Sequence, residues 1–453
     1  MMESLIILVF IVGYLTITLE HTFKINKLIP ALAMMAISWA MVALGNLDVF
    51  NVDTALRVLV PTHLEEIILH HLGKTAEILI FLIGAMTIVE IIDYFNGFST
   101  IKGFIKTKNK TRLLWIFTGL AFVLSAIIDN LTATIVLISI LRKIISRRED
   151  RIWYASLIIV STNAGGAWSP IGDVTTTMLW IANKVTALQL MSHLLIPSII
   201  SVIIPVTIAS FLPAFKGTLK DIEKEETKNE NKYGAFMFYL GLGAIIFVPI
   251  FKTITHLPPY IGMMLSLAVV AIFAEILSQR KFALTTLNKE SDKASHHSPI
   301  HTALQKIEMP SILFFLGILM AVAALESLGF LFGFANWLQV SIPMIGTELA
   351  TSQVSDLVII LLGGASAVID NVPLVAASIG MFPNQLDDPI WHFIAYAAGT
   401  GGSMLIIGSA AGVVAMGMEK IDFFWYLKNF TWMIFLGYIA GAFAFIGMRF
   451  LLS

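Results

Sequence analysis

The chain contains no cysteine among its 453 residues. Disulfide bonds, iron–sulfur clusters and thiolate metal sites are therefore excluded, although this absence says little about the compartment. The net charge is −1, so no basic excess indicates a nucleic-acid partner. No pattern typical of a zinc protease, a P-loop or a dinucleotide-binding fold is present, and we expect no cofactor.

Charge is also scarce. Only 13% of the residues are charged, whereas soluble domains carry about 25%. Hydrophobic residues make up 57% of the chain, and the mean hydropathy is +0.85. The first apolar run, 5–19, has no basic segment before it and no small-residue cleavage site after it, so we expect a retained helix. The sequence predicts an all-α polytopic membrane protein.

A membrane-spanning helix needs about 20 apolar residues. Candidate spans are 4–20, 28–45, 77–95, 193–214, 234–251, 258–277, 309–332 and 430–450. Two further spans, 152–182 and 391–417, are interrupted by glycine and are predicted to be broken helices. Two segments, 113–141 and 353–382, carry an Asp-Asn pair near their middle. The polar stretches 215–233 and 278–308 are expected to be loops, and the histidines near 63–71 to lie on a solvated external stretch.

Sequence features recur between the two halves of the chain. Ser-Ala-Ile-Ile-Asp-Asn at 125–130 returns as Ser-Ala-Val-Ile-Asp-Asn at 366–371. The pair Gly165-Gly166 returns as Gly401-Gly402. We therefore expect two repeats, 1–214 and 234–453, joined by a cytoplasmic linker at 215–233.

The distribution of Lys and Arg predicts how the repeats are oriented. The loops on both sides of 113–141 are basic, whereas the loops on both sides of 353–382 contain no Lys or Arg. Basic loops stay in the cytoplasm, so each segment is best explained as a re-entrant hairpin, the first opening inside and the second outside. This arrangement places 24 of the 29 basic residues inside. Inverted repeats of this kind are common in secondary transporters.

The two hairpin tips are the first candidate site. A charge at membrane depth costs about 3 kcal/mol, so Asp129 and Asp370 suggest a function. With Asn130, Asn371 and Thr132 they offer oxygen ligands for a hard cation such as Na⁺. The alternative is that the asparagines cap the hairpin helices while the aspartates pair with backbone N–H groups.

The glycine-rich stretch 161–177 adds a third buried carboxylate, Asp173, whose counterpart in the second half is Ser409. Hydroxyl-bearing residues are expected to line the same cavity: Ser125, Ser169, Ser366, Thr400, Ser403 and Ser409. No basic residue falls in any predicted lining. Glu90 and its repeat counterpart Glu326 are either ion sites or helix-end residues, and the sequence does not decide between them.

The paired Asp-Asn motifs, the stretch Asn-Ala-Gly-Gly-Ala-Trp-Ser-Pro-Ile-Gly-Asp at 163–173 and Gly-Thr-Gly-Gly-Ser at 399–403 resemble the NhaD family of sodium/proton antiporters. This family belongs to a superfamily that includes arsenite and divalent-anion transporters. The resemblance covers essentially the whole chain. It implies a homodimeric, multi-pass protein of the bacterial cytoplasmic membrane with a scaffold domain and a moving transport domain. It assigns ion binding to Asp129, Asn130, Thr132, Asn163, Asp173, Thr175, Thr176, Asp370 and Asn371.

A secondary transporter that exchanges Na⁺, and also Li⁺, for H⁺ is the expected function. A buried carboxylate holds either a proton or a cation, so the two compete. The main alternative is a Na⁺- or H⁺-coupled anion transporter of the same fold. A membrane-embedded hydrolase is disfavoured, because no nucleophile–base pair is evident near Ser169, and we expect no enzymatic activity.

Overall fold

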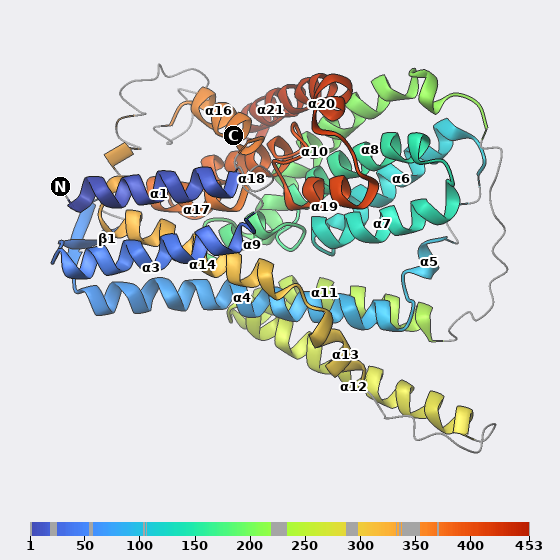
Figure 1. The fold of residues 1–453 in the computed structure, drawn as a ribbon, viewed down its shortest axis with the longest axis horizontal. Helices are drawn as coiled ribbons and strands as arrows, with labels where there is room; N and C mark the ends of the chain where they lie inside the picture. Colours follow the sequence, from blue (N-terminus) through green and yellow to red (C-terminus); the bar gives the residue numbers. More distant parts are fainter. Residues whose placement is uncertain are drawn as a thin grey trace.

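The computed structural model describes residues 2–18, 25–53, 58–102, 105, 107–218, 233–286, 298–331, 333–334, 337, 354–368 and 371–452. Helices dominate the chain, as Figure 1 shows. The first half contains α1 (Met2–Thr18), α3 (Leu28–Leu44), α4 (Leu64–Tyr94), α5 (Ser99–Lys102), α6 (Lys110–Ser125), α7 (Asn130–Ile144), α8 (Arg148–Ala167), α9 (Val174–Ile181) and α10 (Ala187–Ser210). The second half contains α11 (Gly234–Thr255), α12 (Pro259–Thr286), α13 (Pro299–Lys306), α14 (Met309–Ser327), α16 (Asp356–Ser366), α17 (Asn371–Met381), α18 (Pro389–Gly401), α19 (Ala410–Glu419), α20 (Phe423–Tyr426) and α21 (Trp432–Leu452). Short turns of other helix types lie at Pro213–Phe215 and Leu427–Thr431.

The prediction of an all-α polytopic membrane protein is confirmed. Within the described residues, six helices are long and apolar enough to cross a membrane: Leu64–Tyr94, Ala187–Ser210, Gly234–Thr255, Pro259–Ser278, Met309–Ser327 and Phe423–Arg449. Both glycine-rich spans are broken as expected, since α8 stops at Ala167 before α9 starts at Val174, and α18 stops at Gly401 before α19 starts at Ala410.

One local element was not anticipated, and two local expectations were wrong. A two-stranded antiparallel sheet of β1 (Val49–Asp53) and β2 (Val58–Thr62) precedes α4. The helix α4 begins at Leu64 rather than near 77, so His71 is buried and its Nε2 lies 3.1 Å from Ser327 Oγ. The stretch 278–308 is also partly helical, because α12 continues to Thr286 and α13 buries Pro299 and Ala303 against its neighbours.

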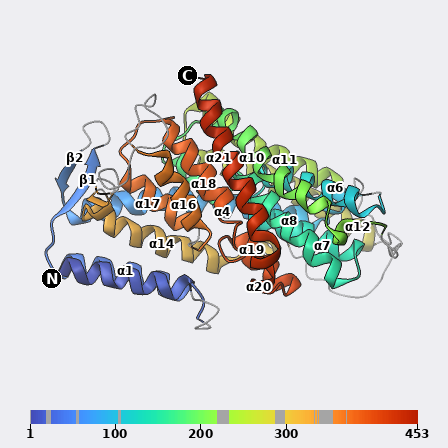
Figure 2. The same cartoon turned by 90° about the horizontal axis from the view of Figure 1, so that it is seen from above.

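The two halves use the same packing contacts. The helix α6 packs on α8 as α16 packs on α18, and α3 packs on α14 as α12 packs on α4. The short helix of each half packs on the hairpin of the other half: α19 packs on α7, and α9 packs on α17. The helices α10 and α21 pack on each other and cross the molecule in Figure 2. In Figure 1 the α6–α7 pair lies towards one end of the long axis and the α16–α17 pair towards the other.

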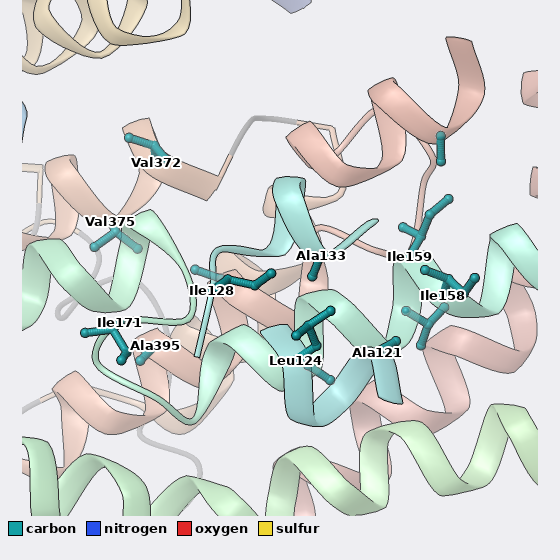
Figure 3. Close-up of a cluster of buried hydrophobic side chains, with 14 of the residues drawn as sticks. Ala121, Leu124, Ile128, Ala133, Ile158, Ile159, Ile171, Val372, Val375 and Ala395 are labelled. Atoms are coloured by element: carbon teal, nitrogen blue, oxygen red, sulfur yellow. The ribbon is translucent and has the colours of Figure 1, made fainter. Parts of the chain in front are cut away.

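Apolar side chains around the first tip hold the central helices together. In Figure 3 Leu124 of α6 lies between Ile128 of the tip on one side and Ile158 of α8 on the other, and Val372 and Val375 of α17 lie on the side of Ile128.

Glycine allows the broken helices to approach their neighbours closely. A Cβ at Gly165 would collide with the backbone of Phe122, and a Cβ at Gly401 would collide with the backbone of Gly363. These two contacts occupy matching positions in the two halves, because Gly165 and Phe122 are the repeat counterparts of Gly401 and Gly363.

Candidate functional site

The first hairpin tip consists of residues 126–129, which separate α6 from α7, and of Asn130, the first residue of α7. Asp129 occupies the N-cap of α7, where its Oδ1 accepts a hydrogen bond of 2.9 Å from the Thr132 backbone N–H. Its Oδ2 accepts a second bond of 2.6 Å from Thr132 Oγ1. The residue that caps the outgoing helix of this hairpin is therefore Asp129 and not Asn130.

Asp173 joins the two tips. Its Oδ1 accepts a bond of 3.2 Å from Asn130 Nδ2, and its Oδ2 accepts a bond of 3.0 Å from Asn371 Nδ2. Thr175 Oγ1 adds a third bond of 2.5 Å to Oδ2. Asp173 is only 3% exposed, so these donors replace the water that the carboxylate loses on burial. One carboxylate thus connects Asn130 and Asn371, which come from the two halves of the chain.

Asn163 extends this network to the second broken helix. Its Oδ1 accepts a bond of 3.1 Å from Asn130, and its Nδ2 donates a bond of 2.9 Å to Ser409 Oγ. Ser409 is the N-cap of α19 and accepts a bond from the Gly412 backbone. Asp173 is the N-cap of α9 with φ −147° and ψ 150°, almost the same as the −143° and 153° of Ser409. The backbone is repeated in the two halves, whereas the side chain is a hydroxyl in one and a carboxylate in the other.

A cavity lies beside these groups. Asp129, Asn130, Asp173 and Asn371 line it together with Thr177 and apolar side chains of α4. The four site residues come from both tips and from the break before α9, so the structure brings the central part of the predicted set into one place.

Lys27 also lines this cavity, which corrects the expectation that no basic residue would do so. It is the N-cap residue of α3, and its Nζ lies 4.5 Å from the centre of the Phe314 ring. The positive-inside rule counted Lys27 among the cytoplasmic basic residues, and no sequence signal placed the start of α3 beside the tips.

Several predicted lining residues instead bond to the backbone. Ser125 Oγ donates to the Thr162 carbonyl at 2.6 Å, and its counterpart Ser366 donates to the Ala398 carbonyl at 2.9 Å. Thr176, Thr400 and Ser403 donate to the carbonyls of Asp173, Tyr396 and Thr400, respectively. Ser169 Oγ accepts from the Ile171 backbone at 3.4 Å. These hydroxyls hold the broken helices in shape, and none of them lines the cavity that contains Asp173.

Two predicted acidic residues lie apart from the Asp173 network. Glu90 lines a second cavity beside α4, and Glu326 lies against Gly380 of α17. Asp370 lies outside the described residues.

A buried ion-pair cluster at the end of α19 was not anticipated. Glu419 is only 1% exposed and forms two ion pairs. Its Oε1 lies 2.7 Å from Arg142 Nε, and its Oε2 lies 3.0 Å from Arg151 Nε. Arg142 and Arg148 also donate to the last carbonyls of α19, which neutralises the partial negative charge of that helix end. The cluster fastens α19 to α7 and α8, and it required tertiary contacts that no sequence pattern shows.

Comparisons with known proteins agree with this architecture. A family model described as a citrate transporter matches residues 5–391. Sodium/proton antiporter 1 of Arabidopsis thaliana is 40% identical over 98% of this chain and 72% of its own length. Sodium/proton antiporter 2 of the same plant is 36% identical over 98% of this chain and 99% of its length. The Na⁺/H⁺ antiporter NhaD of Vibrio cholerae is 31% identical over 96% and 89%. The chain therefore belongs to the citrate transporter family and, within it, to the NhaD family of sodium/proton antiporters.

Proposed function

We propose that this protein exchanges Na⁺ for H⁺ across a membrane by alternating access, with Asp173 as the carboxylate for which the two ions compete. The observation that carries the proposal is that Asn130 and Asn371, one from each hairpin tip, both bond to the buried Asp173. An ion bound at this carboxylate contacts both halves of the chain, so its binding is sensitive to how the halves are arranged.

The chemistry of the cavity suits a small hard cation. Carboxylate oxygens of Asp129 and Asp173 and the amide oxygens of Asn130 and Asn371 are ligands of the type that such cations prefer. Loss of water disfavours a bare carboxylate, and either a proton or a cation removes that penalty. Li⁺ needs the same type of ligand, so we propose it as a second substrate. Asp370, the aspartate of the second tip, completes the proposed set.

The proposed architecture is an inverted repeat with re-entrant hairpins at 113–141 and 353–382. The matching packing contacts of the two halves and the similar backbone at Asp173 and Ser409 support it. We also propose a homodimer surrounded by lipid, as the family resemblance implies. The bacterial cytoplasmic membrane stays a prediction, since the relatives come from bacteria and from a plant.

An anion substrate is the alternative within the same fold, and the description of the matching family model names citrate. An anion would meet the carboxylates of Asp129 and Asp173, and Lys27 is one positive charge against these two. The charge balance of the described lining therefore favours a cation.

Fluorescence dequenching in everted membrane vesicles with an acidic interior tests the proposal. NaCl and LiCl should collapse the proton gradient in vesicles that contain the protein, whereas choline chloride should not. A gradient that responds only to a carboxylate or oxyanion salt would overturn the cation assignment while leaving the fold intact.

A further inference from the structure

The second cavity adjoins the central cavity beside the first tip. It shares Met86, Val89 and Leu131 with the central cavity. It also reaches Thr132, whose hydroxyl bonds to Asp129, so the two cavities meet at the first tip. Glu90 is the first ionisable side chain that α4 presents beyond Val89.

The other charged groups of this second cavity are Asp93, Lys306 and Glu308. Lys306 Nζ lies 3.8 Å from Asp93 Oδ2, and both side chains are about half exposed, so this pair is solvated and weak. Glu90 therefore faces a cavity in which carboxylates outnumber cations, close to the point where the cavity joins the tip.

Among the residues that the structure describes, the same position in the second half is closely packed. Glu326 is the repeat counterpart of Glu90, and Gly380 is the counterpart of Ser139 on the outgoing helix of the hairpin. Ser139 is exposed and lines the second cavity, whereas a Cβ on the buried Gly380 would lie only 2.9 Å from Glu326 Cδ.

The packing of the helices shows the same asymmetry. The helix α14 packs directly on α17. Between α4 and α7, which correspond to them, lies the second cavity. Ile135 of α7 is 38% exposed in it, whereas the corresponding residue of α17, Ala376, is 8% exposed. The two halves thus stand in different states, open beside Glu90 and closed beside Glu326.

We propose that Glu90 and Glu326 are the side-specific carboxylates that pass cations to and from the Asp173 site. Glu90 serves the cytoplasmic face and Glu326 the external face, and the assignment rests on the proposed exchange function. The structure shows the state in which the Glu90 route is open. In the opposite state α14 leaves α17, α4 closes on α7, and Glu90 meets Ser139 as Glu326 now meets Gly380.

Face-specific kinetics test the assignment. Everted vesicles present the cytoplasmic face to added Na⁺, and right-side-out vesicles present the external face. Glu90→Gln should raise the half-maximal Na⁺ concentration at the cytoplasmic face by about threefold or more, because a carboxylate on the route attracts the cation. It should leave the external value within about twofold, the spread expected when no interaction is lost. Glu326→Gln should do the reverse.

Glu149→Gln, at an exposed glutamate in the first turn of α8, is the matched control and should change neither value. Equal shifts at both faces, or no shift, would overturn the proposal.

Cysteine labelling gives a second readout that does not depend on transport. Because the chain has no cysteine, Ile135→Cys and Ala376→Cys each introduce a single thiol at matching repeat positions. A membrane-impermeant maleimide should react with the first from the cytoplasmic face much faster than with the second from the external face. Equal rates would contradict the asymmetry. If the wild-type protein moves no Na⁺, the proposed function fails, and the labelling still decides which of the two routes is open.

Discussion

Asp173 is held by donors from three separate segments: the first tip, the second tip and its own helix α9. A charge in such a place is tolerated because the donors point at it, and each charge-assisted bond contributes about 1.5–3 kcal/mol. The donors also restrict where a cation can bind. The cation has to lie beside the Asp173 carboxylate while at least one of the bonds from Asn130 and Asn371 stays in place.

Asp173→Asn should abolish Na⁺-dependent proton movement, because an amide cannot take up the exchanged proton and lacks the negative charge for which the two ions compete. Dequenching in everted vesicles measures this, with protein content checked by immunoblot. Asp150→Asn is the matched control, since Asp150 forms a partly exposed pair with Lys110 and its loss costs at most about 1 kcal/mol. Residual exchange by Asp173→Asn at the wild-type rate would contradict the central role of this residue.

Thr132→Val should weaken Na⁺ binding while preserving side-chain shape. The variant removes the 2.6 Å hydroxyl bond to Asp129 but keeps the bond from the Thr132 backbone. Loss of one charge-assisted bond corresponds to an increase of about tenfold in the half-maximal Na⁺ concentration. Thr132→Ser retains the hydroxyl and should behave like the wild type, so equal defects in both variants would disprove the role of the hydroxyl.

At the scale of helices, the ends of the broken elements are fastened on each side of the molecule. The α19 end is held by Arg142, Arg148 and Arg151. The loop after α9 is held by the loop before α18, since Lys184 Nζ donates to the Asn384 carbonyl and Asp387 accepts from the Thr186 backbone. These contacts hold the short helices α9 and α19 in place, although the breaks after α8 and α18 interrupt the helical backbone.

Glu419→Gln should destabilise the protein, because it leaves the positive charges of Arg142 and Arg151 without their buried partner. Removing one partner of a buried ion pair costs about 3 kcal/mol, and the partial exposure of Arg142 reduces that value here. The melting temperature of detergent-solubilised protein should therefore fall clearly further than it does for Asp150→Asn. Equal melting temperatures for the two variants would show that the cluster contributes nothing.

Lys184 should make stability depend on pH. Burial lowers the pKa of its ammonium group from 10.5 to about 8, and the charge of Lys74 adds to this effect. Below pH 8 the folded protein bears the cost of a buried charge. Between about pH 8 and 10.5 the folded state has released this proton while the unfolded state keeps it, so stability rises with pH.

Lys184→Met keeps the apolar stem and removes the titrating group. The difference in melting temperature between wild type and variant should therefore move in favour of the wild type from pH 7.5 to 10.5. A difference that stays constant over this range would refute the pKa assignment.

The sequence predicted the elements that depend on local composition. Long apolar runs predicted the spanning helices, and Gly165, Gly166, Gly401 and Gly402 predicted where two of them break. The β1–β2 hairpin and the early start of α4 were missed, because the polar stretch before residue 77 has no strong hydrophobic periodicity.

Features that depend on tertiary contacts could not be predicted. The repeated Asp-Asn pairs indicated the tips, yet nothing in the sequence shows that both asparagines bond to Asp173. The direction of Ser125 and Ser366, which bond to backbone carbonyls rather than lining the cavity, depends on how α6 and α16 pack. The position of Lys27 in the cavity depends in the same way on where α3 begins, since Lys27 is its N-cap.

For the whole molecule, the matched packing of the two halves and the unequal state of their hairpins fit a two-state exchanger. The Asp173 site touches both halves, and in the described part of the chain the second cavity lies beside the hairpin of the first half. Exchange then requires that each of the two ions binds and leaves at the same carboxylate while the open side alternates.

The central claim is that Na⁺ and H⁺ compete for Asp173. Purified protein in weakly buffered, Na⁺-free detergent solution should release protons when NaCl is added, as read with a pH-sensitive dye. Choline chloride should release none, and Asp173→Asn should release fewer protons than the wild type at every Na⁺ concentration. Undiminished proton release by Asp173→Asn would contradict the account.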